Sequence, residues 1–267
     1  MTIFAETDPE EVQFSQRIMQ LFDKTEKLWA ALELLIDAAE GSRLRADDAR
    51  TPHYAVSDYA FGRLGAAAGC IATLKQMIVR ESEDTINMVT GPYGAYALIR
   101  NAVDSAATAL WLLEPGSGTG RIKRRLLLAL DEVEKANAFR RTMDQSTVAP
   151  QRRARLREVA GLAGLGDWKP RKDDLPSMTS ILGQLERYHS NAVLPWLAAW
   201  QLASGHAHGK QWAYLASHDL KAIESKRTET GGQFQVTIRY GVLACVLLEA
   251  VQMLEVAGAR YGQLATA

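Results

Sequence analysis

The sequence has little of what marks several specialised classes of protein. Its 267 residues include only two cysteines, Cys70 and Cys245, too few for a disulfide scaffold or a zinc site built on CxxC pairs. It contains no N-x-S/T glycosylation sequence, and its N-terminus lacks the basic and apolar regions of a signal peptide. The apolar run 242–248 ends at Glu249, well short of the ~20 apolar residues that span a bilayer. These absences predict a cytoplasmic protein that does not enter a membrane.

The chain also lacks an excess of either charge, with 31 basic and 31 acidic side chains. Their distribution is uneven, because residues 1–40 hold 3 basic and 9 acidic side chains and residues 121–172 hold 14 basic and 6 acidic ones. The acidic end can pair with the basic segment, the basic segment can bind anions, or the charges can simply cover a solvated helix surface. The sequence leaves these three interpretations open.

What the sequence does have is one stretch after another with apolar residues at three- and four-residue spacing, which predicts helices. Asp8 is a predicted N-cap, and Pro9 the first residue of a helix of about 30 residues that lasts until Gly41. The other predicted helices are 57–82, 90–115, 121–146, a short one from Pro150, 177–189, 196–208 and 240–261.

The segments between these helices are expected to be irregular, with one exception. Residues 42–56 are a predicted polar loop and 161–176 a candidate mobile loop, whereas 221–238 alternate around Gly231-Gly232 like a β-hairpin. With no internal repeat and no long linker, we expect a single all-α domain over residues 1–267. It is a multi-helix bundle of about eight helices with one small β-hairpin near 221–238. The long first and last helices favour a homodimer.

The helix at 90–115 carries a narrow polar stripe on an otherwise apolar surface. Arg100 and Asp104 are spaced i,i+4, and Tyr93, Tyr96 and Trp111 lie on the same side of the helical wheel. An ion pair in partly dry surroundings is either a strut between helices or a site for an anionic substrate. In the second case Arg100 binds the anion, Asp104 orients Arg100 or His208, and Tyr96 contacts the substrate.

The segment LASGHAHGKQW, residues 202–212, supplies the candidate proton-transfer group. Ser204 and His208 share one helical face, and an unperturbed imidazole titrates in the range that suits general acid–base catalysis. His206 and His208 point about 200° apart on a helix, and Glu186-x-x-His189 is a single ExxH unit. We therefore predict no metal site and no cofactor. The structural alternative is that His208 is only a hydrogen-bonded helix residue.

The basic segment adds arginines, the side chain suited to bidentate recognition of phosphate. Arg124 and Arg125 are the candidate substrate-binding residues beside the GSGTG loop at 116–120, together with Tyr96 and Ser204. That loop follows no predicted strand, so it is no dinucleotide-binding fingerprint, and GHAHGKQ lacks the spacing and the hydroxyl of a phosphate loop.

The segments YALIRNAVDSAATALWLL and LASGHAHG resemble a broad set of uncharacterised bacterial helical proteins with an Arg-x3-Glu/Asp element and a Ser-x3-His-Gly element. Arg100, Asp104, Ser204, His208 and Gly209 match these elements. Some such proteins are discussed with the HEPN group of helical, often dimeric proteins that cleave RNA or act as toxins. The contiguous HEPN motif, Arg followed by four to six residues and His, is absent here.

Two functions therefore remain open. One is an enzyme of toxin or defence type acting on RNA or another anionic substrate, with Arg100, Asp104 and His208 as catalytic residues. The other is a catalytically silent, homodimeric helical module for binding or regulation. The expected partners are a second copy of the chain and a nucleic acid or small anionic ligand.

Overall fold

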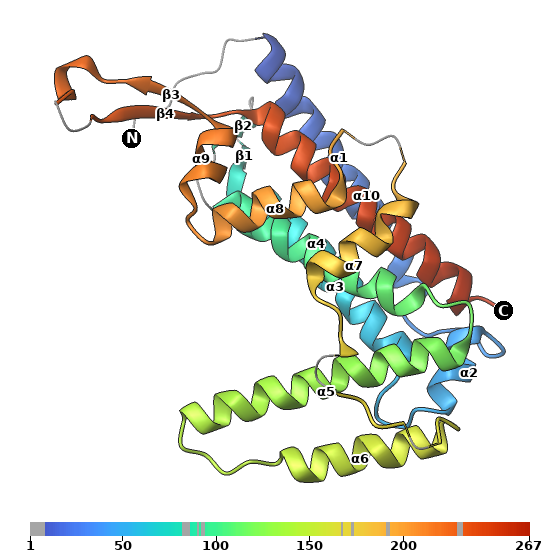
Figure 1. Cartoon of the computed structure of the whole chain (residues 1–267). Coiled ribbons are helices and arrows are strands. Elements are labelled where there is room, and N and C mark those ends of the chain that lie inside the picture. Colours follow the sequence, from blue (N-terminus) through green and yellow to red (C-terminus); the bar gives the residue numbers. More distant parts are fainter. Residues whose placement is uncertain are drawn as a thin grey trace. The chain divides into compact units, whose positions relative to one another are not determined.

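The computed structural model describes residues 9–81, 86–89, 91, 94–166, 168–171, 174–190, 193–228 and 232–267, and within these ranges it is mostly helical (Figure 1). The prediction of a mostly α-helical fold is confirmed. The helices are α1 Pro9–Glu33, α2 Arg43–Ala49, α3 Val56–Ile78, α4 Gly94–Leu113, α5 Gly118–Thr142, α6 Ala149–Leu162, α7 Met178–Leu185, α8 Trp196–Ala207, α9 Gln211–Ser217 and α10 Tyr240–Ala265.

Two antiparallel hairpins accompany the helices in the part of the chain that the structure describes. The predicted one consists of β3 His218–Ala222 and β4 Phe234–Ile238, so it begins three residues earlier than the alternation suggests. The second, β1 Val79–Glu81 with β2 Ile86–Met88, occupies the expected end of the second helix and was not predicted. Three-residue strands are too short to show an alternating pattern.

Several boundaries differ from the sequence prediction. The first helix ends at Glu33 rather than Gly41, and the predicted loop 42–56 contains α2. That helix begins because the Ser42 side chain accepts a hydrogen bond from the Arg45 backbone N–H. It and α9, which was also missed, have seven residues each, about two turns, too few for an apolar period to stand out. Asp8 lies outside the described residues.

The contacts divide the chain into two compact units. Unit 1 consists of residues 1–29, 66–105 and 186–255, and unit 2 of residues 30–65, 106–185 and 256–267. Four helices, α1, α3, α4 and α10, contribute residues to both. We describe each unit by itself below, and the single domain remains a prediction.

Helix α10 is, among the described residues, the one helix long and apolar enough to cross a membrane by length and composition. The apolar run 242–248, which by itself is too short to span a bilayer, is thus only part of this longer apolar helix. Of its most apolar stretch, 61% is buried inside the protein, and the core helix of a soluble protein passes the same test. This finding is weak evidence and does not place the chain in a membrane.

Unit 2 is organised around an ion pair between α2 and the start of α5. Arg121 Nε lies 2.6 Å from Asp47 Oδ2, and the two side chains are only 3% and 4% exposed. The same guanidinium donates to the backbone oxygen of Pro115 at 2.9 Å. Burial raises the pKa of Asp47, and the hydrogen bond and charge of Arg121 oppose this rise. A Cβ on Gly118 would collide with the Asp47 carboxylate, so the helices meet closely.

This pair predicts a specific pattern of stabilities. Arg121→Leu leaves a buried carboxylate without its partner and should lower the free energy of unfolding by about 3–5 kcal/mol. The double variant Asp47→Leu with Arg121→Leu should recover a large part of that loss. Urea denaturation of the wild type, both single variants and the double variant measures the coupling. A single substitution costing under about 1 kcal/mol would contradict the assignment.

Candidate functional site

In unit 1 the structure brings together the predicted pair on α4. Arg100 Nε lies 3.7 Å from Asp104 Oδ2, and the side chains are 30% and 23% exposed. Trp200 of α8 joins them, because its indole N–H donates to Asp104 Oδ1 at 2.6 Å and its ring lies 5.8 Å from the Arg100 guanidinium carbon. The pair therefore ties α4 to α8 through an indole that sequence analysis did not select. Tyr93 lies outside the described residues.

His208, the predicted proton-transfer group, lies at the C-terminal end of α8 with its side chain exposed, whereas Arg100 and Asp104 lie within α4. It follows the last residue of α8, where its backbone N–H donates to the Ser204 oxygen at 3.1 Å and Gly209, at φ +62°, ends the helix. Its side chain is exposed and makes no hydrogen bond or ion pair with the described residues. Ser204 is half-buried in the same turn. Among the described residues, no hydrogen bond or ion pair links His208 to Arg100 or Asp104.

The buried histidine of this segment is His206, two residues earlier. Its ring stacks on Tyr96 of α4 with centroids 4.0 Å apart and planes 10° from parallel. Its Nε2 lies 2.7 Å from the hydroxyl of Ser217, which in turn lies 2.9 Å from Nδ1 of His218. Ser217, His206 and His218 are 0%, 3% and 5% exposed. Tyr96, predicted to contact substrate, is fully buried in this cluster.

The hydrogen bonds of the cluster assign the protons. The Ser217 hydroxyl donates to the Ala213 oxygen at 2.9 Å, so it accepts from both imidazoles. Each ring then carries its proton on the nitrogen facing Ser217, and the opposite nitrogens, Nδ1 of His206 and Nε2 of His218, are the two that make no hydrogen bond with the described residues. Both histidines are therefore neutral. Burial, then the neighbouring His218, lowers the pKa of His206 to about 4, and burial also lowers the pKa of His218.

A third histidine, His189, whose side chain is only 4% exposed, links residues 186–196 to α10. His189 Nε2 lies 2.6 Å from Glu249 Oε2, and its Nδ1 lies 2.9 Å from Glu186 Oε1. Glu249 is fully buried and also accepts from the Leu194 N–H, while Glu186 accepts from the Trp196 N–H. Both ring nitrogens of His189 thus lie within hydrogen-bonding distance of carboxylate oxygens. Within the described residues no group of three or more His, Cys, Asp or Glu side chains is arranged to hold a metal ion.

In unit 2 the two predicted substrate-binding arginines are engaged internally. Arg124 forms an ion pair with Glu114 at 3.0 Å, donates to the Trp111 oxygen and stacks on the Trp111 ring. Arg125 is 8% exposed, donates to the Ala55 oxygen at 3.2 Å and lies 4.2 Å from the ring centre of Tyr59. These arginines attach α5 to its neighbours, which leaves them poorly placed to bind a substrate.

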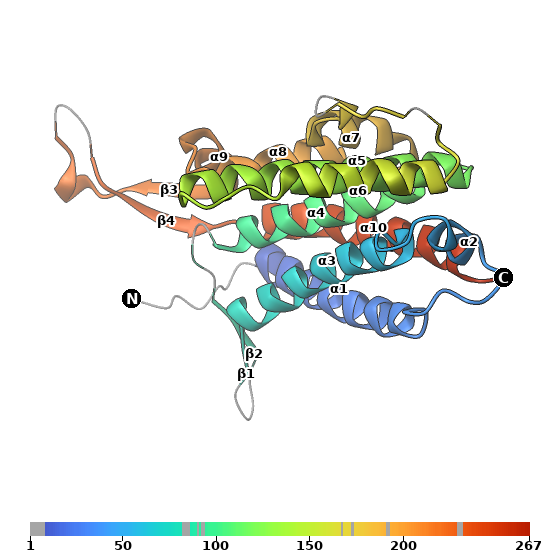
Figure 2. The ribbon, with the colours of Figure 1, turned by 90° about the horizontal axis from the view of Figure 1, so that it is seen from below.

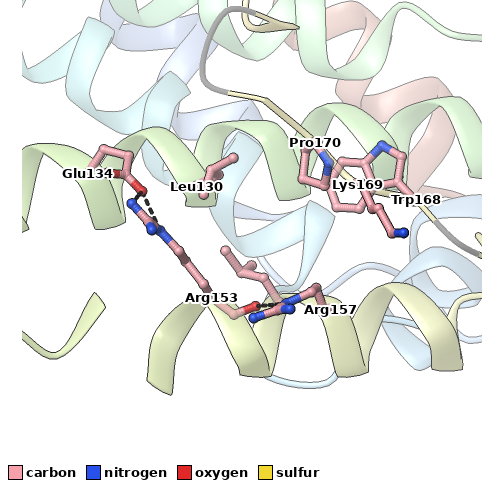
Figure 3. Close-up of a pocket in the computed structure, with 8 residues that line it drawn as sticks. Leu130, Glu134, Arg153, Arg157, Trp168, Lys169 and Pro170 are labelled. Atoms are coloured by element: carbon pink, nitrogen blue, oxygen red, sulfur yellow. Dashed lines mark hydrogen bonds and ion pairs between the residues drawn. The ribbon is translucent and has the colours of Figure 1, made fainter. Parts of the chain in front are cut away.

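One cavity in unit 2 lies further along α5, against α6 and the segment 168–170 (Figure 3). It has a volume of about 370 Å³, within the range of small-molecule sites. Its lining combines cationic, aromatic and apolar side chains with one acidic side chain: Leu130, Glu134, Arg153, Leu156, Arg157, Trp168, Lys169 and Pro170. Figure 3 shows Arg153 and Arg157 on α6 on one side and Trp168, Lys169 and Pro170 on the other.

The charges of this cavity are only partly compensated. Arg153 is paired with Glu134, at 2.5 Å from its guanidinium. Arg157 donates to the Arg153 backbone oxygen at 3.4 Å, and neither Arg157 nor Lys169 forms an ion pair within the described residues. Both side chains are exposed, whereas Trp168 is half-buried. Among the described residues, the cavity therefore combines an aromatic face with two cations that form no ion pair.

Sequence analysis pointed to the basic segment and to the irregular stretch 161–176 separately, but not to this cavity. The signal was present, since the arginines of α6 recur at 152, 153, 155 and 157 and a tryptophan lies between charged residues at 168. What was missing is the return of the chain after α6, which places residues 168–170 against α5.

The neutral histidine cluster predicts a pH dependence of stability. Unfolded histidine titrates near pH 6.5, whereas the pKa of His206 in the folded protein is about 4. The unfolded chain thus binds more protons between these values, so stability is greatest above pH 6.5 and falls as the pH drops toward 4. Comparing urea midpoints across this range, His206→Gln should flatten the dependence and His208→Gln should not. Equal slopes in the wild type and His206→Gln would contradict the assignment.

The Arg100–Asp104 pair predicts a loss of stability rather than of ligand binding. Arg100→Ala removes the cationic partner of Asp104 and should lower the melting temperature, and Arg100→Leu with Asp104→Leu should restore much of it. Differential scanning fluorimetry of these variants measures the effect. Unchanged stability in Arg100→Ala, together with lost binding of an anionic ligand, would instead show that Arg100 is a binding residue.

Comparison of the chain with protein-family models, with curated proteins and with solved structures finds no match in any of the three. The candidate site is therefore defined by its own geometry.

Proposed function

We propose that this protein binds single-stranded nucleic acid, with RNA as the first candidate, in the cavity between α5, α6 and residues 168–170. The observation that carries the proposal is the combination of Arg157 and Lys169, two exposed cations without ion-pair partners among the described residues, with the half-buried indole of Trp168.

The electrostatic part of the proposal rests on the basic character of α6. Four arginines, at positions 152, 153, 155 and 157, occupy this helix with one acidic side chain, Glu158. Glu158 pairs with Arg155 at 2.6 Å, and Arg153 with Glu134 across the cavity. The remaining cations suit phosphodiester groups, whose neutralisation by Lys and Arg releases counterions and drives binding.

The aromatic part of the proposal distinguishes a nucleic acid from other polyanions. A base stacks on an aromatic side chain with little regard to sequence, and cationic side chains then follow the backbone. Trp168 supplies the aromatic face, and Leu130 and Leu156 supply apolar surface on the helices opposite. A simple phosphate would use the cations but gain nothing from the indole.

The proposal is for binding without catalysis. The catalytic alternative needs Arg100, Asp104 and His208 to act on one substrate, and His208 has an exposed side chain with no contact to the pair. His206, the histidine that is buried beside α4, is neutral and held by Ser217. A ribonuclease would use an accessible base and acid, which this cluster does not offer.

Binding of a short fluorescein-labelled single-stranded RNA, followed by anisotropy, tests the proposal. The double variant Arg157→Gln with Lys169→Gln should weaken binding by about tenfold or more and reduce the slope of log Kd against log salt by about 1.4. Trp168→Ala should weaken binding by about tenfold while leaving the salt slope unchanged, and Trp168→Phe should retain most of the affinity.

The matched control is Arg17→Gln with Lys27→Gln, which removes the same charge from exposed positions on α1. This variant should bind nearly as the wild type does. Equal losses in the control and in the cavity variant would show that net charge alone attracts the RNA. Wild-type protein that binds no single-stranded RNA at low salt would refute the proposal outright, as would an unaffected Trp168→Ala.

A further inference from the structure

The β3–β4 hairpin of unit 1 has one polar and one apolar face. Its register pairs Leu220 with Val236 and Ala222 with Phe234, so these four side chains share a face, and the charged residues Asp219 and Lys221 share the other. Figures 1 and 2 both show the hairpin extending away from α8 and α9. Phe234 and Val236 remain 52% and 38% exposed. A two-stranded hairpin with an uncovered apolar face is marginally stable by itself.

The outer edge of β3 offers backbone groups for a further strand. The Arg239 N–H donates to the Ser217 oxygen at 3.3 Å and the Ile223 N–H to the Gln233 oxygen at 2.9 Å. Because hydrogen-bonding groups alternate between the two sides of a strand, the odd-numbered residues of β3 bond to β4. The N–H and C=O groups of Leu220 and Ala222 therefore point to the outer edge, where the sheet formed by the described residues ends.

The charges on β3 select one way of pairing this edge with its own copy. Antiparallel pairing that joins outward groups allows only registers that move in two-residue steps. One register places Asp219 opposite the partner's Asp219, and another places Lys221 opposite the partner's Lys221, both repulsive. The register centred on Leu220 places Asp219 opposite the partner's Lys221 and Lys221 opposite the partner's Asp219. The strand HDLKA is thus complementary to itself in charge and in backbone geometry.

We propose that β3 is the dimerisation edge of this protein, and that two copies pair antiparallel about Leu220 into a four-stranded sheet. This isologous contact continues the apolar face of the hairpin across both copies and gives the outward backbone groups their partners. The outer edge of β4 has only Gln235 and Thr237 on its polar face, so no charge favours a register there. The proposal is independent of nucleic-acid binding, since β3 lies in unit 1 and the cavity in unit 2.

Charge exchange tests the register directly. Asp219→Lys places lysines opposite lysines and Lys221→Asp places aspartates opposite aspartates, so each variant should raise the dimer dissociation constant by about tenfold or more. The double variant Asp219→Lys with Lys221→Asp should dimerise like the wild type. An equimolar mixture of the two single variants should form a heterodimer, because every cross-strand pair is again of opposite charge. Sedimentation equilibrium of the full chain measures all four.

Asp219 also lies 3.8 Å from Arg239 within its own chain, and Arg239→Gln is the control for the loss of that ion pair. It should remain dimeric, and circular dichroism should show that every variant is folded. Three results would overturn the proposal: a monomeric wild type at high micromolar concentration, single variants that dimerise as well as Arg239→Gln, or a mixture of single variants that stays monomeric.

Discussion

The buried ion pair between Asp47 and Arg121 is the contact on which the arrangement of unit 2 depends. It fixes the first turn of α5 against α2, and the next two arginines extend the attachment, Arg124 to Glu114 and Arg125 to the backbone of Ala55. An arginine buried this deeply is stable only when a carboxylate and carbonyl oxygens surround it. The N-terminal part of α5 is therefore an anchor, and the cavity forms further along the helix, where it meets α6.

This division explains how one basic segment can serve two purposes. The arginines at the start of α5 have internal partners, whereas Arg157 and Lys169 are exposed and form no ion pair with a carboxylate of the described residues. Part of the excess positive charge in residues 121–172 is thus paired inside the protein, and part is exposed to solvent. Only the exposed cations can attract a polyanion, because a guanidinium already paired with a carboxylate adds little to the electrostatic field at the protein surface.

Buried polar groups in unit 1 follow the same constraint and account for most of its histidines. Ser217 accepts hydrogen bonds from His206 and His218, and His189 lies between Glu186 and Glu249. In both clusters, hydrogen bonds of the imidazole nitrogens connect helices to one another and to the first residue of β3. These contacts give stability and register to a helical core. His208, in contrast, is exposed and makes no hydrogen bond or ion pair with the described residues.

The sequence predicted the features that depend on local pattern. The helices around residues 57–82, 121–146, 196–208 and 240–261 and the hairpin near 221–238 follow from apolar period and turn residues. The Arg100–Asp104 pair follows from i,i+4 spacing. Features that depend on packing between distant segments were missed. Helical-wheel geometry favoured His208 over His206, because it cannot show that Tyr96 covers one of them and solvent the other. Likewise, nothing local indicates that Trp168 returns to α5.

Amide hydrogen exchange measured with and without single-stranded RNA tests the central claim most directly, because it compares the two candidate sites in one experiment. The account predicts that RNA slows exchange in α6, in the C-terminal half of α5 and at residues 168–171, and leaves α4 and α8 unchanged. Protection confined to α4 and α8, around Arg100 and Trp200, with none in α6, would contradict it and return the binding site to the polar stripe of α4.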